Sequence, residues 1–147
     1  MKPPNILVKK VGDQDVFVLT DFGISKIKVD GVATTTTMKA NTPPYSSEES
    51  LRLMKSHWSF DIWAIGCILF EMMTGVTPYE TPYLNNIEQN LRSCPLPITY
   101  SQELRDLVNL ILTRGQDNSP TIGQVLKTPI VFDELANIIQ SFLPLTE

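Results

Sequence analysis

The chain has 147 residues, 42% of them hydrophobic, which is enough for one domain with a buried core. Its formal net charge of -4 gives no overall basic surface for nucleic acid, so we expect no nucleic-acid partner. Two cysteines, Cys67 and Cys94, are too few for a disulfide framework or a thiolate metal site, and they fit a reducing, cytoplasmic compartment.

Two short runs rich in β-branched residues lie near the start of the chain, at 6–10 and 16–19. The segment between them contains Gly12 and has turn-forming composition, so we expect a β-hairpin. This hairpin would carry Asp21 at its open end. Residues 23–41 have no strong period and contain four consecutive threonines, which predicts a long polar loop.

The pattern becomes helical after residue 45, and its strongest helix is expected at 59–74. Asp61 lies in the first turn of that helix, and Gly75 follows its end. Apolar side chains surround most of its circumference, so we expect it to be buried on nearly all sides. Its apolar stretch is too short to span a bilayer and contains Glu71, so no membrane partner is expected.

Four shorter helices are expected at 46–54, 101–113, 121–127 and 132–142. Either Ser46 or Ser47 would cap the first of them. The expected fold class is therefore mainly α with a short β-hairpin.

Two motifs near the hairpin carry chemistry: Lys-Pro-Pro-Asn at 2–5 and Asp-Phe-Gly at 21–23. A carboxylate and an amide carbonyl suit a hard cation such as Mg²⁺, and an ammonium group neutralises a transferring phosphoryl group. Either motif alone is a weak signal, because each is also typical of an ordinary turn or loop. Together they indicate a Mg-nucleotide phosphate site.

In order and spacing these motifs match the H-R-D-L-x-x-x-N and D-F-G motifs of protein kinases. Residues 61–66, Asp-Ile-Trp-Ala-Ile-Gly, are similar to the kinase D-x-W-x-x-G, and residues 42–45, Thr-Pro-Pro-Tyr, are similar to the G-T-P-x-Y of the substrate-docking loop. The chain thus resembles a eukaryotic protein kinase of the serine/threonine type. The resemblance implies a partial C-terminal lobe of α+β class.

The resemblance also implies roles for individual residues. Asp21 would chelate Mg²⁺ across the β- and γ-phosphates of ATP, Asn5 would hold a second Mg²⁺, and Lys2 would stabilise charge on the transferring phosphoryl group. Leu7 would lie under the adenine ring, with Thr20 at the back of that pocket. Leu7 and Thr20 fit an ordinary hairpin core equally well.

The resemblance also implies roles for three threonines. Thr42 in the docking loop joins Lys2 as a catalytic candidate, because it favours a serine or threonine hydroxyl of a protein substrate over tyrosine. Thr36 or Thr37 would be phosphorylated to order the activation loop, with nearby lysines as partners. A flexible threonine-rich linker is the other interpretation of this segment.

The sequence departs from the kinase pattern at several positions. Asn41 replaces the Gly before Thr42, and Ser47-Glu48-Glu49 replaces A-P-E. Ser119 replaces the arginine that in kinases pairs with the glutamate matched here by Glu49.

Two other polar residues have plainer interpretations. Asp61 would accept backbone N–H groups from the catalytic loop, although an acid in the first turn of a helix needs no such role. His57 is expected to be a surface residue rather than a general base.

Counting back from Asn5 puts the proton-accepting Asp of the H-R-D motif one position before Met1, and the 147 residues contain neither a G-x-G-x-x-G loop nor a V-A-I-K strand. We expect a catalytic-loop remnant and hairpin at 1–22, an activation and docking loop at 23–50, and a helical subdomain at 51–147. In kinases a helix that precedes the catalytic loop covers the one matched by 59–74, so one side of the latter should face water.

Three interpretations remain. The chain is part of a serine/threonine kinase and is inactive alone, or it is a pseudokinase-like protein-interaction module, or it is a fragment that does not fold. A start inside the catalytic loop favours the first, because natural domain boundaries fall in segments with few contacts.

Overall fold

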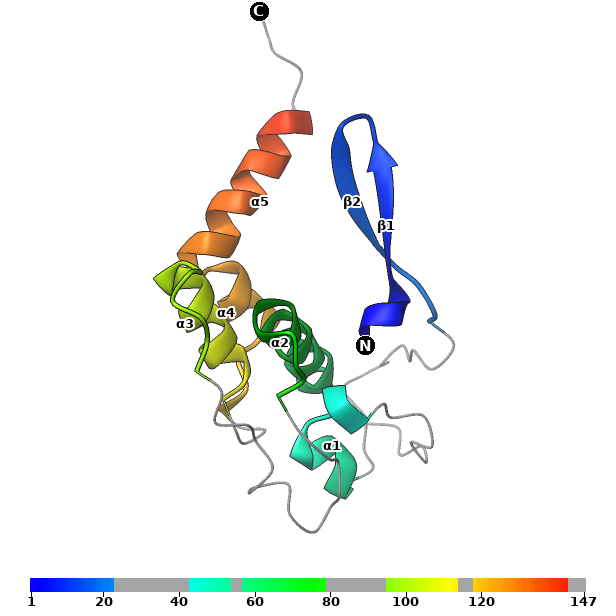
Figure 1. The fold of residues 1–147 in the computed structure, drawn as a ribbon, viewed down its shortest axis with the longest axis vertical. Helices are drawn as coiled ribbons and strands as arrows, with labels where there is room; N and C mark the ends of the chain where they lie inside the picture. The colour runs from blue at the N-terminus through cyan, green and yellow to red at the C-terminus, as the bar shows by residue number, and fades with distance from the viewer. Residues whose placement is uncertain (23–42, 54–56, 79–94, 114–117, 143–147) are drawn as a thin grey trace, which may run out of the picture.

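The computed structural model describes residues 1–22, 43–53, 57–78, 95–113 and 118–142 (Figure 1). Within these ranges the chain forms one antiparallel hairpin and five α-helices, so the expected class, mainly α with a short hairpin, is confirmed. The elements in chain order are the 3-10 turn η1 (Pro3–Asn5), β1 (Ile6–Val11), β2 (Gln14–Leu19), the 3-10 turn η2 (Pro43–Tyr45), α1 (Glu48–Leu53), α2 (Ser59–Thr74), α3 (Gln102–Ile111), α4 (Ile122–Leu126) and α5 (Pro129–Phe142).

The hairpin pairs β1 with β2 in a register that runs from Ile6 opposite Leu19 to Val11 opposite Gln14. Both strands reach closer to the turn than the sequence predicts. The reason is the tightness of the turn, in which Gly12 adopts a positive φ of 61°, a conformation that glycine accepts without steric cost.

Both faces of the hairpin carry exposed apolar side chains. Leu7 and its cross-strand neighbour Val18 lie on one face, and Val8 and Phe17 lie on the other. The most exposed of these, Phe17, keeps 64% of its surface in water. An isolated two-stranded hairpin is marginally stable, so both faces are surfaces that further contacts would stabilise.

The core of the helical part is built around α2, whose bounds agree with the predicted 59–74. Gly75 ends the helix with a positive φ of 76°, and its N–H donates to the Glu71 carbonyl at 2.7 Å. Three groups of apolar side chains surround the helix. They are Ile62 with Leu107, Ile111 and Val125, then Trp63 with Cys67, Tyr45 and Leu51, and then Phe70 with Met73 and Val108.

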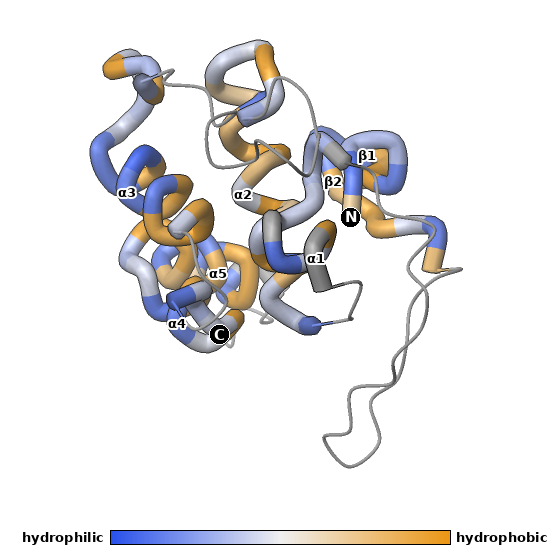
Figure 2. Tube along the Cα trace, turned by 90° about the horizontal axis from the view of Figure 1, so that it is seen from below, coloured by the Kyte–Doolittle hydropathy of each residue, from blue (hydrophilic) through white to orange (hydrophobic). Residues whose placement is uncertain are grey.

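The expectation that one whole side of α2 faces water is wrong. Met72 is the only large apolar side chain of this helix that is exposed, at 66%. The helix α3 and the segment around η2 and α1 pack on different sides of α2 and cover the rest. Figure 2 shows apolar residues both along α2 and on the hairpin, and the larger exposed apolar surface belongs to the hairpin and α5.

Side-chain caps fix the starts of three shorter helices. Ser47 Oγ accepts a hydrogen bond from Ser50 N at 3.1 Å, so Ser47 rather than Ser46 caps α1. Ser101 Oγ accepts from Leu104 N at 3.3 Å at the start of α3. At α4, Thr121 forms a reciprocal capping box with Gln124. These helices lie inside the predicted ranges and are slightly shorter, because the capping residues are not themselves helical.

The last helix, α5, begins at Pro129, three residues before the predicted start at 132. Proline suits the first turn of a helix because its missing N–H has no partner there in any case. A search of the described residues finds no candidate membrane-spanning helix.

Candidate functional site

Backbone hydrogen bonds at the open end of the hairpin bring the two sequence motifs together. Thr20 N donates to the Asn5 carbonyl at 2.8 Å, and Asn5 N donates to the Lys2 carbonyl at 3.0 Å. The Thr20 hydroxyl also donates to the Asn5 carbonyl, at 3.3 Å. The pairing of β1 with β2 therefore places Asn5 beside the residue that follows Thr20.

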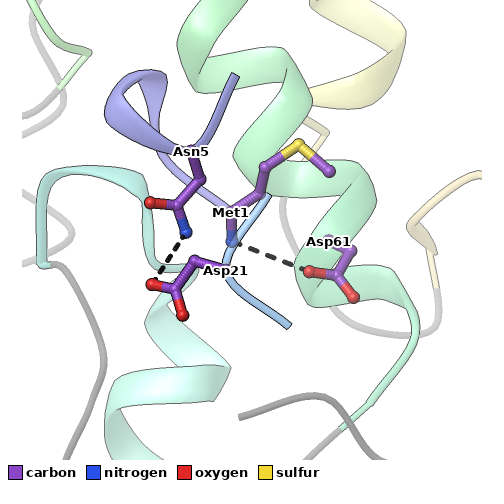
Figure 3. Close-up of polar contacts among 4 residues, drawn as sticks. All are labelled: Met1, Asn5, Asp21 and Asp61. Carbon is purple, nitrogen blue, oxygen red and sulfur yellow. Dashed lines mark hydrogen bonds and ion pairs between the residues drawn. The ribbon is translucent and has the colours of Figure 1, made fainter. Parts of the chain in front are cut away.

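That residue is Asp21, and its carboxylate meets the Asn5 amide. Asn5 Nδ2 donates to Asp21 Oδ2 at 3.4 Å, in an exposed position (Figure 3). Asp21 is also the one non-glycine residue with a positive φ, 59°, in the part of the chain described. Such a conformation costs on the order of 1–3 kcal/mol and is concentrated at functional sites.

The donor set fits a magnesium ion. Because the amide nitrogen of Asn5 faces the carboxylate, the amide oxygen and the second carboxylate oxygen remain as ligands for a cation. Mg²⁺ is commonly held by one or two carboxylates together with phosphate oxygens and water. The residues described contain no group of three or more His, Cys, Asp or Glu that could hold a metal.

The structure describes three of the other candidate residues: Thr20, Lys2 and Leu7. Thr20 is half-buried and bonded to Asn5. Lys2 is half-buried in extended backbone before η1, and its ammonium makes no ion pair with an acid in the described ranges. Leu7 lies on β1 with 53% of its surface exposed. The remaining candidates, Thr36, Thr37 and Thr42, lie outside the described residues.

The start of the chain also contacts α2. The amino group of Met1 lies 3.7 Å from Asp61 Oδ1 (Figure 3). The Asp61 side chain is 73% exposed, so this ion pair contributes little to stability. The ion pair does show that the first residues of the chain and the first turn of α2 are neighbours.

A second polar contact, between Tyr45 and Glu71, was missed from the sequence. The Tyr45 hydroxyl donates to Glu71 Oε2 at 2.7 Å and ties η2 to α2. Burial, followed by this hydrogen bond, raises the pKa of Tyr45 to about 12. The available signal was Glu71 itself, since a carboxylate within an apolar helix needs a donor.

His57 is half-buried rather than a simple surface residue. Its Nδ1 lies 2.7 Å from Ser59 Oγ, and its ring centroid lies 4.9 Å from that of Trp58. These contacts place the histidine in the segment that leads into α2.

Comparison with known proteins finds relatives among the protein kinases. The G2-specific protein kinase nimA of Emericella nidulans is 31% identical over 134 residues, which cover 89% of this chain and 18% of nimA. The serine/threonine-protein kinase Nek6 of Oryza sativa is 30% identical over 140 residues, which cover 92% of this chain and 25% of that protein. The chain therefore spans a quarter or less of the length of these two relatives.

The fold agrees with these sequence relationships. The structure of the kinase PK-1 from Cydia pomonella granulovirus superposes with a TM-score of 0.70 at 24% identity, over 89% of this chain and 49% of PK-1. The sequence profile of the protein kinase domain matches residues 1–131. This match includes the hairpin, the Asn5–Asp21 pair and the core helix α2, and the chain belongs to the protein kinase family.

Proposed function

We propose that this chain is part of a serine/threonine protein kinase that transfers the γ-phosphate of ATP to hydroxyl groups of a protein substrate. The observation that carries the proposal is the contact of 3.4 Å between Asn5 and Asp21 at the open end of the hairpin. Relatives named as serine/threonine kinases support the choice of hydroxyl acceptor. Thr42, in the docking loop, is the residue we assign to that preference.

Asp21 and Asn5 would hold Mg²⁺, which neutralises the phosphate charge when bound. Lys2 would add one positive charge beside the transferred group. The strained backbone of Asp21 supports this assignment, because strain of this kind is retained where a side chain must point in a fixed direction.

The face of the hairpin that carries Leu7 would support the adenine ring. Val18 is the cross-strand neighbour of Leu7, and Val16 lies on the same face two residues earlier in β2. Their apolar surface is exposed and would lose contact with water when a flat heteroaromatic ring packs on it. Thr20 would close the back of this pocket.

Each of the three segments of the chain would have its own role. Residues 1–22 would form the phosphate-site hairpin, 23–50 the activation and docking loop, and 51–147 a helical subdomain. Phosphorylation of Thr36 or Thr37 would order the loop by pairing with basic residues. A cytoplasmic location fits the one cysteine described, Cys67, which is a buried free thiol.

We propose that the 147 residues alone do not catalyse phosphotransfer, because they contain no H-R-D aspartate and no glycine-rich loop. A pseudokinase-like interaction module is the second candidate function. The apolar, exposed faces of the hairpin favour it, since large exposed apolar surfaces mark interaction sites.

Magnesium-dependent nucleotide binding separates the two candidates. Titration of ATP into the isotope-labelled chain, with and without Mg²⁺, should shift the NMR signals of Asn5, Leu7 and Thr20. Asp21→Asn should remove the magnesium dependence, whereas Asp13→Asn, an exposed acid in the hairpin turn, should preserve it. Chemical-shift changes that are the same with and without Mg²⁺ would contradict the assignment of Asp21 as a metal ligand. A magnesium dependence that persists in Asp21→Asn would contradict it as well.

A further inference from the structure

A hydrogen-bonded rung between Thr20 and Asn5 lies at the open end of the hairpin. The paired register of β1 and β2 ends with Ile6 opposite Leu19. One step further, Thr20 N donates to the Asn5 carbonyl at 2.8 Å, so the pairing continues for one more residue. Asp21 follows at once and takes the positive φ of 59°. Thr20 therefore joins the paired strands to the strained residue.

The Thr20 hydroxyl provides a second donor to the same carbonyl. Its Oγ1 lies 3.3 Å from the Asn5 oxygen, and Thr20 is half-buried although Leu19 and Asp21 on either side of it are exposed. A backbone carbonyl has two lone pairs and can accept both hydrogen bonds. Together the two donors restrict rotation of the peptide group of Asn5. The amide side chain of Asn5 leaves the same residue, so its direction depends on that peptide group.

A contact between side chains completes the arrangement. Asn5 Nδ2 donates to Asp21 Oδ2 at 3.4 Å (Figure 3). Asn5 is thus bonded to Thr20 through its backbone and to Asp21 through its side chain. A positive φ in a residue other than glycine persists where the surrounding contacts fix the chain. The bonds of Asn5 to these two consecutive residues are contacts of this kind.

The lengths of the two side-chain contacts bear on metal binding. At 3.3 and 3.4 Å, both are longer than most hydrogen bonds in proteins, which lie at about 2.5–3.2 Å. Such contacts can still shorten, and in functional sites they commonly do so when a ligand binds. Mg²⁺ requires near-ideal octahedral geometry, so a small rotation of Asn5 changes how well its amide oxygen fits the ion. A hydroxyl that limits this rotation would contribute most when the metal is bound.

We propose that Thr20 is a positioning residue for the Asn5–Asp21 pair, and that its hydroxyl holds the Asn5 carbonyl and thereby sets the direction in which the Asn5 amide oxygen meets Mg²⁺. The inference rests on the proposed function, in which Asn5 and Asp21 hold the metal. It adds to the proposed place of Thr20 at the back of the adenine pocket, because the hydroxyl hydrogen is used on Asn5. Loss of the hydroxyl should therefore affect the metal rather than the adenine ring.

Three substitutions separate the hydroxyl from the rest of the side chain. Thr20→Val replaces the hydroxyl with a methyl group of similar size, whereas Thr20→Ser keeps the hydroxyl and removes the methyl group. Thr113→Val is the matched control. The Thr113 hydroxyl also donates to a backbone carbonyl, that of Asn109 at 3.1 Å, but it lies at the end of α3 and outside the candidate site.

The first measurement is NMR of the isotope-labelled 147-residue chain without nucleotide or metal. The nuclear Overhauser effect between the N–H and Hα of Asp21 should be strong in the wild-type chain, because a positive φ brings these hydrogens close together. Thr20→Val should weaken this effect and shift the side-chain amide signals of Asn5. Thr20→Ser and Thr113→Val should leave both unchanged. Wild-type signals in Thr20→Val would overturn the proposal.

The second measurement is the ratio of the ATP affinities with and without Mg²⁺. Thr20→Val should lower this ratio by about three- to tenfold, as expected for one lost hydrogen bond, while its affinity for ATP without Mg²⁺ stays at the wild-type value. Thr20→Ser and Thr113→Val should retain the wild-type ratio. An equal loss in Thr20→Ser would assign the effect to the methyl group and overturn the proposal.

These measurements keep failure of this proposal distinct from failure of the proposed function. A wild-type affinity that does not depend on Mg²⁺ would overturn the proposed metal site, and this inference with it. A wild-type dependence that Thr20→Val retains in full would overturn only the role of Thr20. If Thr20→Val does not fold, the carbonyl carbon signal of Asn5 in the wild-type chain decides. It should shift more with ATP and Mg²⁺ together than with ATP alone, and an equal shift would overturn the proposal.

Discussion

Tyr45 and Glu71, 26 residues apart in sequence, are joined by a hydrogen bond of 2.7 Å between the phenol hydroxyl and Oε2. The bond connects η2 to the core helix α2. It also gives the half-buried Glu71 carboxylate a donor. Packing of Tyr45 beside Trp63 and Cys67 reinforces the connection.

Replacement of Tyr45 by phenylalanine should destabilise the chain by about 1–3 kcal/mol, because it leaves a half-buried carboxylate without this donor. Urea denaturation followed by circular dichroism measures the change. Tyr100→Phe is the matched control, since Tyr100 is exposed and should lose less than about 0.5 kcal/mol. Equal losses in the two variants would show that the Glu71 contact contributes nothing.

Stability should fall as pH rises from about 10 to about 12. In the unfolded chain Tyr45 titrates near its ordinary pKa of 10.0, whereas in the folded chain its pKa is raised to about 12 by burial and by Glu71. Between these values the unfolded state has lost a proton that the folded state retains, so deprotonation favours unfolding. The slope of unfolding free energy against pH should be shallower in Tyr45→Phe, and an unchanged slope would argue against the raised pKa.

At Gly66, α2 packs closely against the end of α3. A Cβ atom at this position would lie 2.5 Å from Ile111 Cγ2 and 2.9 Å from Leu112 Cδ2. Gly66→Ala should therefore destabilise the chain by about 1–3 kcal/mol through overpacking, measured by thermal melting. Gly123→Ala in α4 meets nothing nearer than 4.0 Å and should be neutral or slightly stabilising, since alanine favours helix. A neutral Gly66→Ala would mean that α3 shifts freely.

The purified chain should show no phosphotransfer to a serine/threonine substrate from labelled ATP. Loss of a positioned base lowers the rate by roughly 10²–10⁴-fold, before any missing nucleotide contact is counted. Asp21→Ala distinguishes contamination from true activity. Transfer that this substitution abolishes would contradict the prediction, whereas transfer that it leaves intact comes from another enzyme.

Self-association should depend on the hairpin rather than on α2. Phe17 and Met72 are exposed to similar extents, 64% and 66%, but Phe17 lies beside the exposed Val8 on one face of the hairpin, whereas Met72 is the only exposed large apolar residue of α2. Phe17→Ser should lower the associated fraction in size-exclusion chromatography, because large apolar patches drive association. Met72→Ser should change it little. The opposite order would restore the sequence-based expectation of an open side on α2.

Local signals accounted for most of the fold. The bounds of α2 follow from its apolar pattern and from Gly75, and both are visible over one stretch of sequence. The strand ends and the start of α5 differed because Gly12 makes a tight turn and Pro129 fits a first helical turn. The covering of α2 was mispredicted because it depends on how α3 and η2 pack in three dimensions.

The candidate site also has a part that the sequence predicts and a part that it does not. The proximity of Asn5 and Asp21 follows from two motifs joined by one hairpin, so sequence order was sufficient to predict it. The hydrogen bond between Tyr45 and Glu71 and the packing of Tyr45 against Trp63 join residues from separate elements. No periodic pattern encodes such contacts, because they arise only when the elements pack.

Within the described residues no further strand is added to either edge of the two-stranded sheet, and the two edges are not equivalent. Along β1, Lys9 and Lys10 interrupt the apolar residues, and charges of this kind discourage the addition of a foreign strand. Along β2, residues 16–19 are four consecutive apolar residues without a charge. Backbone groups on that edge can pair with an extended segment of another chain. Growth of cross-β fibres from this protein would therefore begin at β2, unless another segment pairs with that edge first.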